Sequence, residues 1–190
     1  ALLLFTTTLS FAQKAKPKAA TSSALATFEN LKAEIITEGG KQKLAIIIDN
    51  AGKKENVILK DLTTKDKAQQ PTNFKIKSFT VSGVKLYHFS YTENIITETK
   101  LKKENALITS NEIWDLSATK LKILGNIQTV TNIKEIKKLG KSEATETVEK
   151  TRREGFEFVL TKDFEVLLST KIQTNKYKFN ATTRRYDPKK

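Results

Sequence analysis

The stretch that decides the fold is residues 74–92, FKIKSFTVSGVKLYHFSYT, in which apolar and polar side chains alternate on both sides of Ser82-Gly83. Such alternation is typical of β-strands, because successive side chains point to opposite faces of a sheet. The Thr, Val, Phe and Tyr content suits a pleated, half-buried surface. The sequence therefore predicts two paired strands, 74–81 and 84–92, joined by a tight turn.

Similar strand signals continue in both directions, separated by polar turns about every 8 to 12 residues, a spacing typical of antiparallel sandwiches and barrels. Gly39-Gly40 and Lys162-Asp163 are expected to be hairpin turns. The fold class that we expect is a mainly β, antiparallel sandwich or barrel-like domain. The other strands are expected from residue 31 to the Gly-Gly turn and at 44–49, 56–62, 95–99, 107–116, 120–131, 156–161, 164–170 and 172–183.

One short surface helix is expected at about 142–154, within SEATETVEKTRREG. Ser142 suits a helix N-cap, and Gly155 suits the left-handed residue that ends a helix. Glu146 and Lys150 would form an i,i+4 pair. The apolar stripe is thin, so this helix is predicted to lie on the surface.

Two other architectures remain open. An elongated β-roll would stack the same strands in an open array. An α+β fold would result if residues 132–139 were helical, since apolar residues recur there every three positions. A helix over 23–38 also competes with the strand predicted from Leu31.

The N-terminal residues suggest export. Residues 1–12, ALLLFTTTLSFA, resemble the apolar part of a signal peptide truncated at its start, with cleavage expected before Gln13. Residues 13–27 are rich in Ala, Lys, Ser and Thr and are predicted to be a flexible tether. Residues 28–190 are predicted to form a single β-rich domain. The expected location is the periplasm, the outer-membrane surface or the extracellular space.

The chain is strongly basic, with 34 Lys and Arg against 21 Asp and Glu, a net charge of +13 and a pI near 9.7. This balance favours contact with anions such as anionic lipid, lipopolysaccharide or acidic glycan, including peripheral contact with a membrane. Only four of the basic residues are Arg, the residue preferred for bidentate phosphate recognition. No specific nucleic-acid partner is therefore expected.

The candidate contact residues lie near the C-terminus. Lys176 and Lys178 alternate with Tyr177 and Phe179, a pattern of binding surfaces and of ordinary half-buried strands alike. Two adjacent arginines, Arg184 and Arg185, follow this strand. Trp114, elsewhere in the chain, is a candidate for stacking on a glycan. The remaining candidates for anion or ligand contact are Arg184, Arg185 and Trp114.

The residues give no indication of catalysis, a metal or a cofactor. There is no Cys, and His88 is the only His, so a conventional zinc site or a His-based triad is not expected. His88 is predicted to share a strand face with Leu86 and Ser90. We accordingly expect an exported, non-enzymatic binding or structural protein of the bacterial cell envelope.

Two other functions stay open. A β-barrel interior would suit a carrier of lipid or of a small hydrophobic ligand. Two carboxylates brought about 5 to 10 Å apart by the fold would suit a glycoside hydrolase.

Overall fold

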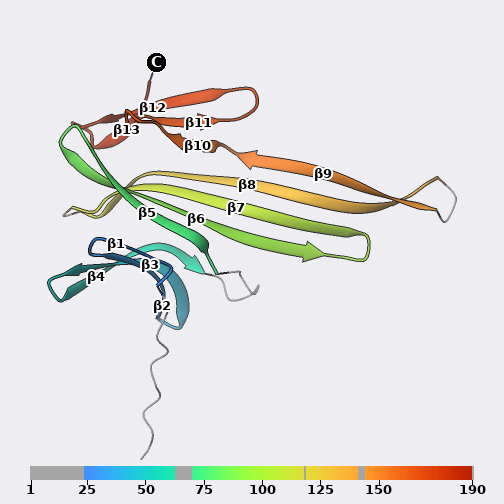
Figure 1. Cartoon of the computed structure of the whole chain (residues 1–190), viewed down its shortest axis with the longest axis horizontal. Coiled ribbons are helices and arrows are strands. Elements are labelled where there is room, and N and C mark those ends of the chain that lie inside the picture. The colour runs from blue at the N-terminus through green and yellow to red at the C-terminus, as the bar shows by residue number, and fades with distance from the viewer. Residues whose placement is uncertain (1–23, 63–69, 118, 141–143, 190) are drawn as a thin grey trace, which may run out of the picture.

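The computed structural model describes residues 24–62, 70–117, 119–140 and 144–189, and over these residues the chain is entirely β (Figure 1). All strand pairs are antiparallel, and the strands form three open sheets. The prediction of a mainly β, antiparallel fold is confirmed. The sheets of the described ranges stay open rather than closing into the barrel that was one expected form. In the part of the chain that the structure describes, no helix could span a membrane.

Each sheet is formed by consecutive strands. The N-terminal sheet consists of β1 (Ala26–Phe28), β2 (Leu31–Glu38), β3 (Lys41–Asn50) and β4 (Lys53–Leu62). The central sheet consists of β5 (Thr72–Val81), β6 (Val84–Glu98), β7 (Lys102–Asp115), β8 (Leu121–Lys138) and β9 (Thr145–Gly155). The C-terminal sheet consists of β10 (Glu157–Leu160), β11 (Val166–Ser169), β12 (Thr174–Asn180) and β13 (Arg185–Pro188).

The central sheet lies between the other two, and β6 shows why. Its alternation directs Phe89 and Tyr91 to the core shared with the N-terminal sheet, whereas Leu86 belongs to the core shared with the C-terminal sheet. Both faces of this part of the strand are therefore buried. In the first core the rings of Phe74 and Tyr91 stack with centroids 5.3 Å apart. The predicted pairing of β5 with β6 around Ser82-Gly83 is confirmed, with Val81 opposite Val84.

The predicted helix at about 142–154 is wrong. Residues 141–143, with the expected cap Ser142, lie outside the described residues, and Thr145–Gly155 is strand β9, paired with β8 along its whole length. Its β-branched residues favour a strand, and the thin apolar stripe offered a helix little to bury. The charges pair across strands instead, with Glu149 bound to Lys134 at 2.7 Å.

Two helices that the sequence left open as alternatives are absent from the described residues, and one expectation is corrected. Residues 132–139 are not helical, because β8 runs to Lys138, and the competing helix over 23–38 is replaced by β1 and β2. The strand predicted from Leu31 is confirmed as β2. The expected signal peptide and the tether up to residue 23 lie outside the described residues, but Ala26 and Thr27 belong to β1, not to a tether.

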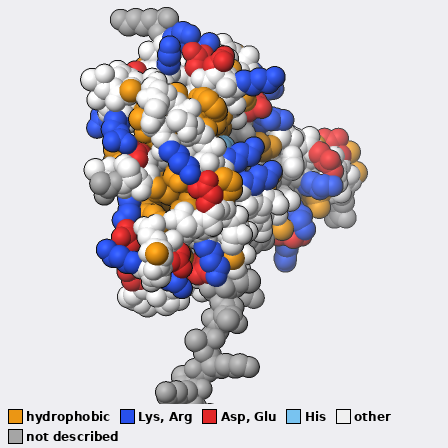
Figure 2. Space-filling model, turned by 60° about the vertical axis from the view of Figure 1, so that its left-hand side comes forward, with side chains coloured by type: hydrophobic (Ala, Val, Ile, Leu, Met, Phe, Trp, Pro, Cys, Tyr) orange, Lys and Arg blue, Asp and Glu red, His pale blue; other side chains and the backbone are white. Residues whose placement is uncertain are grey.

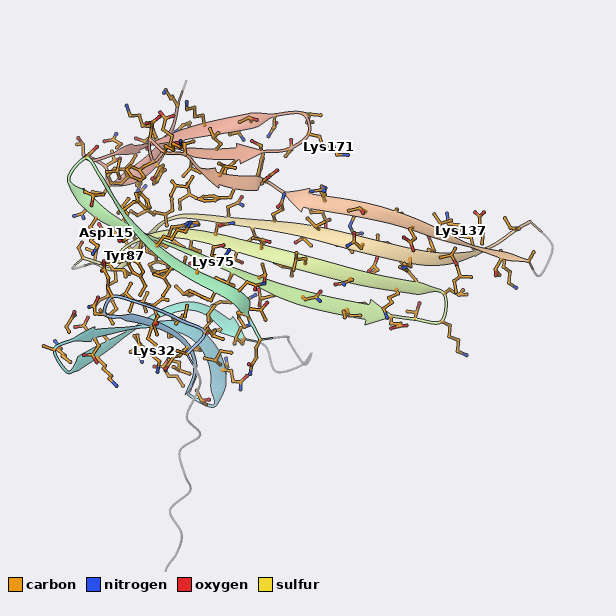
Figure 3. The ribbon with its side chains drawn as sticks, viewed as in Figure 1. Lys32, Lys75, Tyr87, Asp115, Lys137 and Lys171 are labelled. Carbon is orange, nitrogen blue, oxygen red and sulfur yellow. The ribbon has the colours of Figure 1, made fainter. Side chains whose placement is uncertain are left out.

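The central sheet is much longer than the sheets that cover it. Its far end, here called the projection, consists of residues 93–98 of β6, 102–109 of β7, 128–138 of β8 and 145–154 of β9. Figure 1 shows it extending beyond both other sheets. Side chains fill the space between the sheets around Tyr87 and Asp115, whereas Lys137 lies on the uncovered projection (Figure 3).

Gly155 forms the passage from the central sheet into the C-terminal sheet. Its φ is +78°, a backbone conformation that favours glycine, and a Cβ atom at this position would clash with the carbonyl oxygen of Ile127. A side chain cannot fit without moving β8. This glycine thus allows β9 to end against β8 and the chain to turn into β10.

Candidate functional site

Three of the predicted contact residues lie together on the outward face of the C-terminal sheet. Phe179 of β12 and Tyr186 of β13 pair with each other and are buried against the central sheet. Because side chains alternate along a strand, Lys176, Lys178 and Arg185 point to the opposite, solvent side. Lys189 joins them, since its N–H donates to the carbonyl of Lys176. This outward cluster of Lys176, Lys178, Arg185 and Lys189 is called the basic face below.

One carboxylate, that of Glu165, binds two of the four cations of the basic face. Glu165 forms an ion pair with Lys176 at 2.7 Å and accepts a hydrogen bond from the Lys189 ammonium at 2.9 Å. These two bonds lower the pKa of Glu165 to about 2, so it is ionised across the physiological range. Lys178 and Arg185 form no ion pair within the described part of the chain. They are the cations that an external anion would meet first.

A shallow hollow lies beside Lys178, one of these two cations. Its volume is about 420 Å³, and it is open to solvent. Asp187, which would oppose an anion here, accepts a hydrogen bond from the side-chain amide of Asn180 at 2.8 Å. The lining residues are Lys178, Phe179, Asn180, Ala181, Asp187, Pro188 and Lys189.

Arg184 points the other way from Arg185. Its guanidinium forms an ion pair with Asp115, whose side chain is 3% exposed, and donates to the Ser117 hydroxyl at 3.4 Å. Asp115 ends β7, so this contact fastens the turn before β13 to the central sheet. The structure therefore separates Arg184 from the basic face and places it at a junction between sheets.

Trp114 is also away from the basic face. It is 7% exposed and lies in the core shared with the N-terminal sheet. Its indole N–H donates to Glu112 at 2.7 Å, and the Lys122 ammonium lies 5.6 Å from the ring centroid. The ring packs in the interior, so the structure does not present it as a platform for stacking on a glycan.

His88 occupies the strand face that the alternation predicted, between the central and C-terminal sheets. Its ring stacks on Phe158 with centroids 5.0 Å apart, and its Nε2 lies 3.0 Å from the Asn111 side-chain oxygen. Burial lowers the pKa of His88, an effect that the hydrogen bond to Asn111 opposes and the charge of Lys77 reinforces. A neutral ring at physiological pH suits a packing role.

The buried carboxylates are held by donors rather than facing one another in a cleft. Glu93 is bound by Lys60, Glu112 by the Trp114 indole, and Asp115 by Arg184. Among the described residues no group of His, Cys, Asp and Glu side chains is arranged to hold a metal ion. These contacts stabilise the packing of strands and sheets.

A second pocket, of about 280 Å³, lies between the N-terminal and central sheets. Its two lysines are already engaged, Lys85 with Glu29 at 2.7 Å and Lys120 with Glu55. It is a small, partly polar cleft, unlike the enclosed apolar interior that a lipid carrier would need. The open sheets likewise remove the barrel on which that alternative was based.

Figure 2 shows Lys and Arg side chains spread over the surface in view, with acidic groups between them and an apolar area among them.

No family model matches the chain, and neither a curated protein nor a solved structure matches it. Function is therefore inferred from the residues of this chain alone.

Proposed function

We propose that the protein is an exported, non-enzymatic binding protein of the bacterial cell envelope, and that its basic face contacts the phosphate-bearing surface of lipopolysaccharide. The observation that carries this proposal is the placing of Lys176, Lys178, Arg185 and Lys189 on one outward sheet face. The location follows from the apolar residues 1–12, which resemble a signal peptide.

The energetics favour such contact. Each Lys or Arg near an anionic membrane surface contributes about 1 kcal/mol, and the effect fades within a Debye length of about 8 Å at physiological salt. Several cations on a flat sheet face can approach such a surface together, and the net charge of +13 adds long-range attraction. The expected binding is moderate in strength and strongly dependent on salt.

The proposal is tested by sedimentation with vesicles that contain lipopolysaccharide, across a salt series. The chain should begin at Gln13, so that the apolar residues 1–12 do not contribute to retention. A double variant, Lys178→Glu with Arg185→Glu, reverses the two cations of the basic face that form no ion pair with any described residue. We expect it to lose most of the binding at low salt.

The matched control makes the same change of charge on another sheet. Lys41→Glu with Lys54→Glu alters two exposed lysines of the N-terminal sheet, far from the basic face (Figure 1). This control is expected to keep at least half of the binding. Equal losses of binding in the two double variants would show that net charge, rather than the basic face, drives binding. If the wild-type protein itself does not sediment with the vesicles, the proposal is rejected.

A further inference from the structure

The projection of the central sheet has an open edge along the last residues of β6. The neighbouring strand β5 ends its pairing at Thr72, opposite Thr92, and Pro71 precedes it. Residues 93–98 of β6 pair with β7 on one side and with no described strand on the other. An unpaired edge of this kind offers a row of free N–H and C=O groups.

The hydrogen-bond pattern identifies which groups are free. The N–H of Thr99 donates to the carbonyl of Lys102 at 2.7 Å, which makes this pair a hydrogen-bonded one. Hydrogen-bonded and non-hydrogen-bonded pairs alternate along an antiparallel ladder. The backbone groups of Asn94, Ile96 and Glu98 therefore point away from β7, toward the open edge.

This edge lacks the usual protection. Natural edge strands carry Lys, Pro or bulges that discourage pairing with another chain. Residues 93–98 read ENIITE, with no Lys and no Pro; their two charged residues are at the ends, and the first, Glu93, is bound by Lys60. Between them Ile95 and Ile96 are 47% and 48% exposed on opposite faces. The Oδ1 atom of Asn94 is buried and has no hydrogen-bond partner among the described residues.

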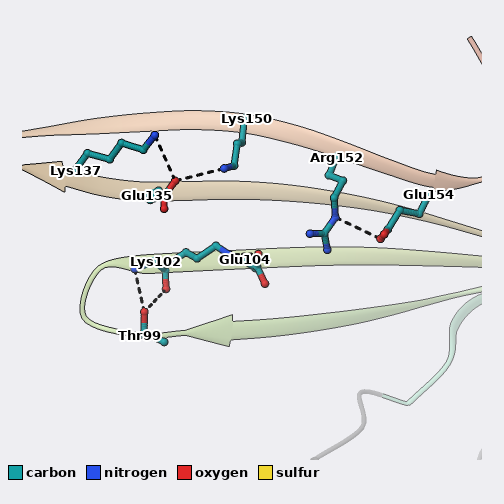
Figure 4. Close-up of polar contacts among 8 residues, drawn as sticks. All are labelled: Thr99, Lys102, Glu104, Glu135, Lys137, Lys150, Arg152 and Glu154. Atoms are coloured by element: carbon teal, nitrogen blue, oxygen red, sulfur yellow. Dashed lines mark hydrogen bonds and ion pairs between the residues drawn. The ribbon is translucent and has the colours of Figure 1, made fainter.

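The other edge of the projection differs. Strand β9 carries charged side chains along most of its length, and ion pairs hold the sheet there. Figure 4 shows Lys150 contacting Glu135 and Arg152 contacting Glu154. Ile133 is 3% exposed although no other sheet covers it, because Glu104 and Lys150, its partners in the register, lie beside it with long side chains. This edge is guarded by charge.

We propose that the open edge of β6 pairs with the same edge of a second copy of this chain, forming a two-fold dimer with a continuous sheet. A register centred on Ile96 places Ile96 opposite its own equivalent and Asn94 opposite Glu98, so all three outward-facing residues form backbone hydrogen bonds. No like charges then face each other, and the side-chain N–H of Asn94, not its Oδ1, is placed to donate to the Glu98 carboxylate of the second copy. Such an isologous contact closes on itself and leaves no free β6 edge.

The contact is short, so the dimer is expected to be weak and to form with rising concentration. The net charge of +13 opposes it, and salt should strengthen it by screening that repulsion. Sedimentation equilibrium over a range of protein concentrations, at low and at high salt, measures this association directly. A chain that stays monomeric at every concentration in both salts would overturn the proposal.

Two proline variants locate the contact. Ile96→Pro removes an N–H that faces the open edge of β6 without breaking the β6–β7 ladder, and should weaken self-association roughly tenfold or more. Thr147→Pro is the matched control on β9: the N–H of Leu139 donates to the carbonyl of Ala144, so the alternation turns the N–H of Thr147 away from β8. Association should survive in this control.

A third variant guards against misfolding by proline. Ile96→Lys keeps every backbone donor but places two ammonium groups opposite each other in the two-fold register, and should also weaken the dimer. Loss of association in Thr147→Pro with retention in both Ile96 variants would assign the contact to β9 and refute the proposal.

Discussion

The Lys60 ammonium lies 2.9 and 2.7 Å from the two carboxylate oxygens of Glu93, joining β4 of the N-terminal sheet to β6 of the central sheet. Glu93 is 6% exposed, and both of its carboxylate oxygens are bound by this lysine. The contact stands where the N-terminal sheet ends and the projection begins. Glu93 follows Phe89 and Tyr91 on the same face of β6, and the bond to Lys60 lets its carboxylate lie beside their hydrophobic core.

Replacing Lys60 by Met should destabilise the protein by about 1–3 kcal/mol, because it leaves a buried carboxylate without its partner. Urea denaturation followed by tryptophan fluorescence measures the change, since Trp114 lies in the same core. Lys54→Met is the matched control: it lies on the same strand, is exposed, and should alter stability by less than about 0.5 kcal/mol. Equal effects of the two changes would contradict a role for the Lys60–Glu93 pair.

Gly155→Ala should destabilise the protein more than Gly39→Ala. Both glycines have a positive φ, which costs an alanine about 1–2 kcal/mol, but the space around Gly39 is empty. At Gly155 the added methyl group meets the Ile127 carbonyl, so β8 or β9 must also shift. Thermal unfolding of the two variants side by side measures the difference, and a Gly155→Ala protein no less stable than Gly39→Ala would contradict this account.

The sequence predicts correctly the strands in which apolar and polar side chains alternate. The prediction of strand bounds is wrong where a charged residue lies within a strand. The pairing of 74–81 with 84–92 was readable from alternation and the Ser82-Gly83 turn. Strand β6, however, is one continuous strand where the sequence predicts two, 84–92 and 95–99, because Glu93 and Asn94 interrupt the apolar pattern. The compensating lysine is 33 residues away in the chain, and no local pattern reveals it.

The helix prediction failed for a related reason. The charges of 142–154 suit a helix as well as they suit an edge strand, and only the long partner β8 distinguishes the two structures. At the basic face the alternation did separate Lys176 and Lys178 from their aromatic neighbours. The opposite directions of Arg184 and Arg185 follow from Asp115, another distant residue that sequence reasoning could not place.

Glu165→Gln should strengthen binding to lipopolysaccharide vesicles. It frees Lys176 and Lys189 from their ion pairs and removes one negative charge from the basic face. Because the pKa of Glu165 is about 2, the wild-type carboxylate stays charged on mild acidification and keeps these lysines engaged. Sedimentation with vesicles at low salt measures the gain, with Glu149→Gln on β9 of the projection, which likewise removes one negative charge and frees one lysine, as the control for net charge. Unchanged or weaker binding of Glu165→Gln, relative to that control, would count against the basic face.

His88 should make the free energy of unfolding depend on pH. Burial lowers the pKa of His88 in the folded protein, whereas in the unfolded chain it returns to about 6.5. Below that pH the unfolded chain takes up a proton that the folded chain resists, so stability falls as pH decreases from about 6.5 toward the folded-state pKa. His88→Gln cannot take up this proton and should lose less stability between about pH 7.5 and about pH 5.5. Urea denaturation at the two pH values measures the difference. The slope of stability against pH is compared, because losing the stacking on Phe158 lowers stability at every pH.

Lys77, whose charge also disfavours the protonated ring, provides a second check on His88: Lys77→Met should reduce the dependence of stability on pH without removing it. Identical slopes in wild type and His88→Gln would show that other groups govern the response.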